Sequence, residues 1–347
     1  MGDLLWDCFY NSILWRWGPK IYLFPILINM KSFLINFSLF ILLVGSLALG
    51  LSILSDYAIN QRKNHLLKIS KDINIVFMGD SNIECAVNDS LVPNSINIAQ
   101  SGEAYMYTYV KLKSLLEYND QIKTIFIGFS NADILKDTED RWLFSDEFVI
   151  EKIASYNYLL NNSDKYLLIK NNPDAYFRGL MKSIFSNFKA FIKSFSRVDR
   201  RIRNFGGYEY LVRDKLQEDI KWNLLVEDKL HEKALVQEKY LMRISQLCRQ
   251  KSIKLVLLNT PKHKSPNTNI IAVKKIWLSI RNSLSRDSLL DLSTLSFPDS
   301  CYSDLTHLNY IGAKLFSQYL KEKLHSNQND TSDSIQIGSI HTATDNP

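Results

Sequence analysis

The stretch Asn74-Ile-Val-Phe-Met-Gly-Asp-Ser-Asn-Ile-Glu-Cys-Ala86 joins two kinds of local structure. Its first half is a run of β-branched and aromatic residues, which predicts a buried strand, and the residues after Ser81 favour a helix. Between the halves, Gly79 permits a tight turn and is followed by an acid and a hydroxyl. Two interpretations are open. Either Asp80 or Ser81 is a plain helix N-cap, or Ser81 is a nucleophile held at the edge of a sheet.

The rest of the sequence alternates strand patterns with helix patterns, and these strands are predicted at 73–79, 95–99, 122–130, 253–261 and 288–293. Amphipathic helix patterns lie between the strands and after the last one. Such alternation predicts an α/β fold with a mostly parallel, doubly wound sheet. Ligands in such folds collect outside the carboxyl ends of the strands, which is where the Gly-Asp-Ser stretch falls.

The composition excludes several classes of protein. With 46% hydrophobic and 22% charged residues, the 347-residue chain is not disordered as a whole. The net charge is +6, but the basic residues are interspersed with acids, so we expect no nucleic-acid partner. No two of the four cysteines have C-x-x-C spacing, and the six histidines lack ligand spacing. We therefore expect no metal site and no cofactor.

An apolar segment from Phe33 to Leu54 has 22 residues and no charge. This length matches a helix that crosses a bilayer, and we expect residues 33–54 to anchor the chain in a membrane. A cleaved signal peptide is the alternative, since small residues follow near a cleavage position. Basic residues lie on both sides of the segment, so charge does not fix its orientation. Met30 is an alternative start of the protein.

The anchor divides the chain into further predicted parts. Residues 1–32 precede it as a cytoplasmic or interfacial segment, and 55–70 form a connector. The α/β domain extends over 71–325, and residues 326–347 are polar, without periodicity, and predicted to be a disordered tail. A segment at about 134–232, rich in Phe, Tyr, Lys and Arg, interrupts the domain as a helical insertion. We interpret it as a lid or packing element, a groove for an anionic or sugar polymer, or a membrane-facing surface.

A base for Ser81 is available near the other end of the chain. In "SDLTHLN", Asp304 lies three residues before His307, just ahead of the last predicted helix. The carboxylate can hold the imidazole in the tautomer whose other nitrogen accepts a proton. A surface histidine beside a helix cap is the other interpretation of this pair.

With Ser81 near one end and Asp304 and His307 near the other, the sequence resembles the SGNH (GDSL-type) hydrolase superfamily. The resemblance covers roughly residues 71–133 and 252–325. It implies a flavodoxin-like three-layer α/β/α fold, with the serine after the first strand and Asp-x-x-His before the last helix. It further implies that Ser81 is the nucleophile, His307 the base and Asp304 its orienting partner.

The resemblance also implies an oxyanion hole, to which the backbone amide of Ser81 contributes at the start of a helix. A family glycine after the second strand donates a second amide, and "NIAQSGEA" matches it with Gly102. The third family motif, Gly-x-Asn-Asp, is loosened here to "IGFSNADI", where Asn131 is the candidate donor and Ser130 a weaker substitute.

Two further residues lie at predicted strand ends without an assigned role. They are Asp133 and His263. His263 either lines the pocket or belongs to a surface loop.

With its expected membrane anchor and its loosened third motif, the sequence resembles the branch of this superfamily that is related to extracytoplasmic polysaccharide O-acetylation. This implies a serine esterase or O-acyltransferase that acts on acyl esters, acetyl in the simplest case, of an envelope glycan. The expected partners are the ester or glycan substrate, the bilayer and a membrane-bound acyl donor. The α/β domain would be extracytoplasmic (periplasmic) on a single-pass anchor.

Two other functions stay open. The first is a catalytically inactive binding or assembly module for surface polysaccharide on the same fold. The second is a structural membrane protein in which Gly-Asp-Ser is a chance turn. The distance between Ser81 and His307 tests the second, because a separation above about 10 Å would exclude proton transfer between them.

Overall fold

The structure is a computed structural model that describes residues 30–51, 53–54, 57, 67–193, 206–212, 214–223, 232–263, 278, 280–282, 284 and 287–329. The side chains of residues 131, 187–193, 222–223 and 325–329 are outside this description. The chain divides into two compact units, Met1–Tyr57 and Ala58–Pro347, and each is considered by itself.

The first unit contains a helix at Met30–Leu51 with a mean hydropathy of 2.3. No part of its apolar window is buried within the protein. At about 1.5 Å per residue, 22 residues span about 33 Å, enough to cross the hydrocarbon core of a bilayer. The helix begins three residues before the predicted Phe33. Length and composition show that it can cross a membrane, a property that signal sequences share. The predicted segment before residue 30 and most of the connector lie outside the described residues.

The second unit is built on five strands, and these are β1 (Ile75–Met78), β2 (Ser95–Asn97), β3 (Thr124–Gly128), β4 (Lys254–Asn259) and β5 (Ser288–Asp291). Their order is β2-β1-β3-β4-β5 and all neighbours are parallel. This is the flavodoxin-like order, in which ligands bind where the strand order reverses, beside β1 and β3. The five predicted strands and the α/β class are confirmed.

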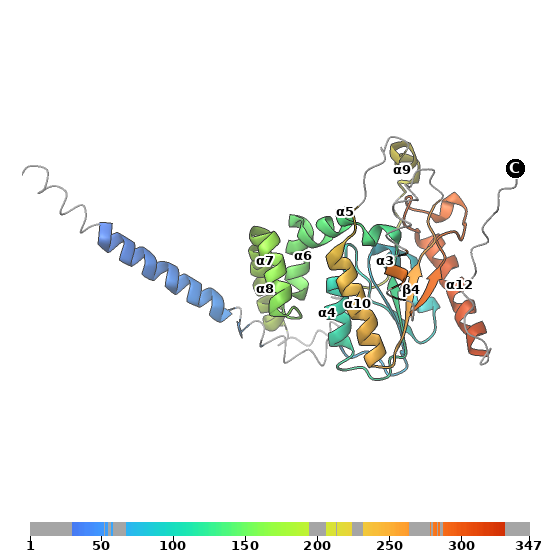
Figure 1. Ribbon diagram of the computed structural model, residues 1–347, viewed down its shortest axis with the longest axis horizontal. Helices are drawn as coiled ribbons and strands as arrows, with labels where there is room; N and C mark the ends of the chain where they lie inside the picture. Colours follow the sequence, from blue (N-terminus) through green and yellow to red (C-terminus); the bar gives the residue numbers. More distant parts are fainter. Residues whose placement is uncertain are drawn as a thin grey trace, which may run out of the picture. The chain divides into compact units, whose positions relative to one another are not determined.

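Helices cover both faces of the sheet, because successive strand residues point to opposite sides. Val76 and Met78 pack with α4 (Tyr105–Leu115) and α10 (Leu235–Gln250) on one face. Phe77 packs with α3 (Ser81–Ala86) and α12 (Tyr310–Asn329) on the other. In Figure 1, α4 and α10 lie on one side of β4 and α12 lies on the other. The three-layer α/β/α architecture is therefore present.

The described parts of the insertion are largely helical. Their elements are η2 (Asn131–Ile134), α5 (Lys136–Glu139), the π-helix η3 (Asp140–Phe144), α6 (Asp146–Tyr156), α7 (Asn162–Asn171), α8 (Pro173–Lys193) and α9 (Leu216–Asn223). Two short 3-10 helices outside it are η1 (Asp89–Leu91) and η5 (Asp299–Cys301). Buried residues of α6, α7 and α8 belong to the same core cluster as α4 and α10, so these helices extend one layer of the domain.

At the C-terminal end, α12 continues to Asn329, four residues into the segment expected to be a disordered tail. Residues 326–329 include no proline or glycine, so no helix-breaking residue ends α12 at the expected start of the tail. The rest of the predicted tail lies outside the described residues.

Candidate active site

Ser81 is held on a tight turn between β1 and α3. Gly79 has φ +128°, and a Cβ atom there would lie 2.9 Å from the backbone nitrogen of Gly128 at the end of β3. Only glycine suits both the conformation and this close approach. Asp80 is the N-cap of α3, since its side chain accepts the Asn82 N–H at 3.1 Å. The capping role therefore belongs to Asp80, and the Ser81 hydroxyl is left for another partner.

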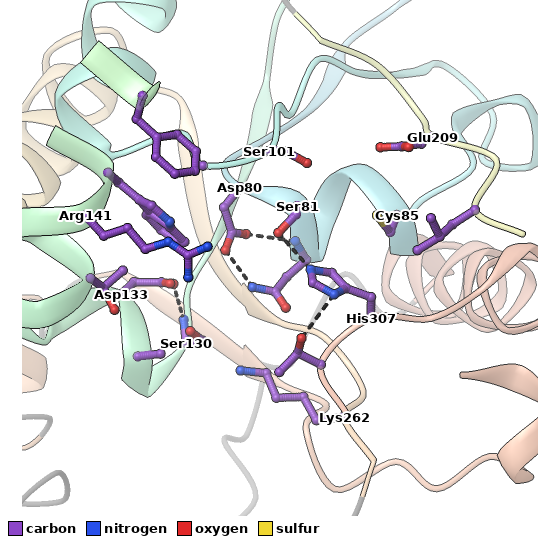
Figure 2. Close-up of a pocket in the computed structure, with 18 of the residues that line it drawn as sticks. Asp80, Ser81, Cys85, Ser101, Ser130, Asp133, Arg141, Glu209, Lys262 and His307 are labelled. Carbon is purple, nitrogen blue, oxygen red and sulfur yellow. Dashed lines mark hydrogen bonds between the residues drawn. The ribbon is translucent and has the colours of Figure 1, made fainter. Parts of the chain in front are cut away.

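That partner is His307, 226 residues away in the sequence. Its Nε2 lies 2.8 Å from Ser81 Oγ, and Figure 2 shows the two side chains directed at each other. His307 Nδ1 lies 2.9 Å from each oxygen of the Asp304 carboxylate. A chance Gly-Asp-Ser turn far from His307 is therefore excluded. The geometry fits a hydroxyl that donates to Nε2 and an Nδ1–H that donates to the carboxylate.

Local hydrogen bonds keep the Asp304 carboxylate charged. Burial alone would raise its pKa, but the hydrogen bond and charge of His307, with the backbone amides of Thr306 and His307, hold the pKa well below its usual range. Those amides donate to Asp304 Oδ1 at 2.9 and 2.8 Å. A fixed negative charge at this position stabilises an imidazolium at His307.

Gly102 lies in the loop after β2, beside the cavity that Ser81 also lines. The amide of Gln100 donates to the carbonyl of Gly79 at 2.9 Å, which ties this loop to the nucleophile turn. Gly102 has φ +60°, and a Cβ there would lie 1.9 Å from Cε1 of Phe148, so a larger residue is not accommodated. Within the described residues, no acceptor is recorded for the backbone amide of either Ser81 or Gly102. Both amides are therefore available to a ligand oxygen.

A buried polar network fixes the loop that carries Gly102. Lys152 of α6 is fully buried and donates to the Ser101 carbonyl at 2.7 Å. The hydroxyl of Tyr156, also on α6, lies 2.8 Å from Glu103 Oε2, to which it donates, and 3.0 Å from Gln100 Oε1. Lys111 of α4 pairs with Glu103 inside the domain. The insertion therefore supports the loop of Gly102, whose amide has no recorded acceptor among the described residues.

A second part of the insertion, residues 206–212 and 214–215, crosses the loops of the site without forming a helix. Gly207 donates its amide to the carbonyl of Ala99 at 3.0 Å, and Glu209 donates to Glu84 at 3.0 Å. Lys215 donates to Ser303 at 2.7 Å. These backbone bonds link the loop after β2, the helix after Ser81 and the loop of Asp304. The extended conformation of this segment was not predicted from the sequence, because backbone hydrogen bonds leave no side-chain pattern.

The candidate residues open into a cavity of about 600 Å³, whose wall includes Ser81, Gly102 and His307. The insertion adds wall residues that the sequence did not identify, and these are Asp137, Thr138, Arg141, Trp142, Phe148, Glu209 and Leu211. Arg141 stands 5.9 Å from the ring centre of Phe148. Figure 2 shows Arg141 and Glu209 on different sides of the cavity around Ser81. Such a mixed wall suits a ligand with both apolar and polar parts.

Two buried carboxyl groups, Asp80 and Asp133, also line the cavity. Burial and the charge of Asp80 raise the pKa of Asp133 to about 7. Burial also raises the pKa of Asp80, and the positive charge of Lys262 opposes both shifts. Asp133 accepts the Ser130 amide at 2.6 Å, while its other oxygen is buried and has no hydrogen-bond partner among the residues that the structure describes.

The remaining candidates take different positions. Asn131 begins η2, but its side chain lies outside the described residues, so its oxyanion role stays a prediction. Ser130 and Asp133 line the cavity. His263 does not line it; its ring lies 3.2 Å from Asp299 and packs edge-on against Tyr302. Among the residues that the structure describes, no cluster of His, Cys, Asp and Glu could hold a metal ion.

Comparison with known proteins gives distant matches. A protein-family model matches residues 200–329, less than half of the 347 residues. None of the curated proteins compared with the chain matches it. A solved structure described as a platelet activating factor from Streptococcus pneumonia is 14% identical, covering 83% of this chain and 99% of that one, with a TM-score of 0.36.

Two further solved structures come from Bacteroides. One described as an acylhydrolase from Bacteroides fragilis is 13% identical over 77% of this chain and 94% of that one, with a TM-score of 0.34. A GDSL-like lipase from Bacteroides thetaiotaomicron is 8% identical over 79% and 98%, with a TM-score of 0.33. Likenesses of this size carry no argument about function, so the site is interpreted from its own geometry. The sheet order, the Gly-Asp-Ser turn after β1 and the Asp-x-x-His loop before α12 give this chain the SGNH-type arrangement that its sequence resembles.

Proposed function

We propose that the protein is a membrane-anchored serine esterase or O-acyltransferase that works through an acyl-Ser81 intermediate. The observation that carries this proposal is the chain of short contacts from Ser81 to His307 to Asp304, at 2.8 and 2.9 Å, at the wall of an open cavity. Nucleophile, base and orienting group are in hydrogen-bond reach of one another, which nucleophilic catalysis requires.

In the first half-reaction, the Ser81 Oγ–H bond breaks as the proton passes to His307 Nε2 and Oγ bonds to the ester carbonyl carbon. The carbonyl electron pair moves onto oxygen, and the amides of Ser81 and Gly102 donate to this oxyanion. The oxyanion then re-forms the carbonyl, the ester C–O bond breaks, and His307 returns its proton to the departing alcohol. Asp304 stays ionised throughout and balances the imidazolium charge.

In the second half-reaction, water or an alcohol gives its proton to His307 while its oxygen bonds to the acyl carbon. The bond between this carbon and Ser81 Oγ then breaks, and His307 returns the proton to Oγ, which restores the free serine. Water makes the protein an esterase, and a sugar hydroxyl makes it an O-acyltransferase. The insertion bears on this choice, because a transferase has to admit an alcohol while excluding water from the acyl-enzyme. Phe148 and Trp142 supply apolar cover beside Ser81.

The finer proposal is an acetyl ester of an envelope glycan as substrate, with the anchor at the Met30–Leu51 helix, a membrane-bound acyl donor as partner, and the α/β domain outside the cytoplasm. Its supports are the resemblance of the sequence, the span-length helix and the polar residues in the mixed cavity wall.

The test is hydrolysis of 4-nitrophenyl acetate by the full chain in detergent or nanodiscs. We expect turnover in the wild type and loss of roughly 10⁴-fold or more in Ser81→Ala, the scale on which removal of a nucleophile acts. Ser90→Ala, which changes an exposed serine elsewhere, is the matched control. Equal turnover in Ser81→Ala and the wild type would remove Ser81 from the mechanism, and absence of turnover in both would favour the binding-module alternative.

A further inference from the structure

Helix α8 presents three large apolar side chains to solvent. Phe177, Met181 and Phe185 are 56%, 46% and 68% exposed. They are spaced by four residues and therefore lie along one face of the helix. Other α8 residues, Tyr176 and Ile184 among them, are buried in the domain. The helix thus has one apolar face that packs inward and a second that nothing in the described structure covers.

The span-length helix of the same chain indicates which surface this face of α8 meets. The span-length helix is described without a break to Leu51, residues 53–54 and 57 are also helical, and the α/β domain is described from Leu67 onward. The 16 residue steps from Leu51 to Leu67 reach at most about 55 Å when fully extended. If the helix lies in a bilayer, this tether keeps the domain close to the bilayer surface at all times.

The connector also joins the domain on the layer that contains α8. Leu67 and Ile69 are buried in the core cluster that includes residues of α6, α7 and α8, whereas α12 belongs to the cluster on the other face of the sheet. Asn119 fixes this junction, since its side chain donates to the Leu67 carbonyl at 2.7 Å and accepts the Ile69 amide at 2.9 Å. Leu67 and Ile69 therefore pack in the same layer of the domain as α8.

We propose that the face of α8 formed by Phe177, Met181 and Phe185 docks on the phospholipid bilayer that holds the Met30–Leu51 helix. The three side chains enter the boundary between headgroups and acyl chains, as in other interfacial helices. The exposed Lys182 beside them reaches headgroup phosphates with its ammonium group. This inference rests on the membrane anchor of the proposed function and not on its chemistry.

The test uses the full chain in phosphatidylcholine–phosphatidylglycerol nanodiscs, with and without nitroxide-labelled lipid. A bimane fluorophore is attached in a Cys8→Ser background, in which Cys85, Cys248 and Cys301 are buried. The probe sites are Met181→Cys on α8, Leu315→Cys on α12 as the matched exposed control, and Leu42→Cys in the span. Circular dichroism establishes that each labelled variant is folded.

We expect nitroxide lipid to quench the probe at residues 42 and 181, with quenching at residue 181 at least about threefold stronger than at residue 315. Quenching at residue 42 together with equal, weak quenching at 181 and 315 would overturn the docking proposal and leave the anchor intact. A lack of quenching at residue 42 would overturn the anchor and the docking together. Ester hydrolysis by the same samples reports on the proposed chemistry independently.

Discussion

The α/β sheet and the insertion contribute different things to one cavity. The loops at the sheet carry the groups to which the proposed function assigns the reaction: Ser81 follows β1, and the Asp304–His307 loop precedes α12. The insertion supplies none of these three, but it provides Phe148 and Arg141 in the wall and Lys152 beneath the Gly102 loop. The proposed reacting groups thus come from the sheet loops alone, whereas the cavity wall is shared between these loops and the insertion. Substitutions in the sheet loops should abolish turnover, and those in the insertion should tune it.

Asp304→Asn is expected to have the largest effect among the substitutions that leave Ser81 in place. The asparagine amide cannot supply the negative charge that balances the imidazolium. The amide also favours the wrong tautomer of His307, so kcat should fall by roughly 10⁴-fold. Steady-state hydrolysis of the chromogenic ester measures this loss. Asp299→Asn, beside His263, is the matched control and should stay within about twofold of the wild type. A loss of less than tenfold for Asp304→Asn would show that the sheet side does not carry the chemistry as proposed.

Gly102→Ala tests the place where the two regions meet. The new Cβ would meet the Phe148 ring at 1.9 Å and would strain a backbone with φ +60°, so the amide should move away from the oxyanion. We expect kcat/KM to fall by about 10²–10³-fold, the cost of one oxyanion donor. Gly102→Ala combined with Phe148→Ala removes the clash but not the backbone strain, so it should recover part of the loss. If Gly102→Ala retained full activity, its amide would have no role in the reaction.

Lys152→Met sharpens the distinction by changing the insertion alone. It leaves the Ser101 carbonyl without its buried donor, so the Gly102 amide should be less well placed. We expect kcat to fall about tenfold with a smaller change in KM, as for an interaction that acts mainly in the transition state. Lys152→Arg should restore part of the activity. Lys136→Met, which loses only an exposed ion pair with Asp140, is the control. Equal changes in both Met variants would argue against a positioning role for Lys152.

Asp133→Asn should have the smallest effect, on stability and not on turnover. Burial and the charge of Asp80 raise the Asp133 pKa to about 7 from an ordinary value of 3.8. Between these values the folded state holds a proton that the unfolded state has lost, so this group lowers the free energy of unfolding as pH rises from about 4 to about 7. Above pH 7 its contribution is constant.

Scanning fluorimetry at several pH values measures this effect. From pH 5 to pH 7 the melting temperature of the wild type should fall relative to that of Asp133→Asn. Parallel curves for the two proteins would contradict a raised pKa at Asp133.

The position of the strand-end residues at one edge of the sheet could be predicted from the sequence, for a physical reason. Short β-branched runs bounded by turn residues mark buried strands, and the carboxyl ends of parallel strands place Ser81, Gly102 and Asp133 at one edge. The insertion was predicted only as helical. Which helix face meets the Gly102 loop depends on tertiary packing, so the contact of Phe148 with Gly102 and the buried Lys152 have no periodic signal. The extended segment that carries Glu209 was missed because its contacts are made by the backbone.

The most direct test of the central claim is covalent labelling of the full chain with a fluorophosphonate, followed by mass spectrometry. Attack by Ser81 displaces fluoride and leaves one phosphonyl group on its oxygen. We expect a single adduct, located on the peptide that contains Ser81, in the wild type, with none in Ser81→Ala and much slower labelling in His307→Gln. An unlabelled wild type, or an adduct that persists in Ser81→Ala, would contradict the account.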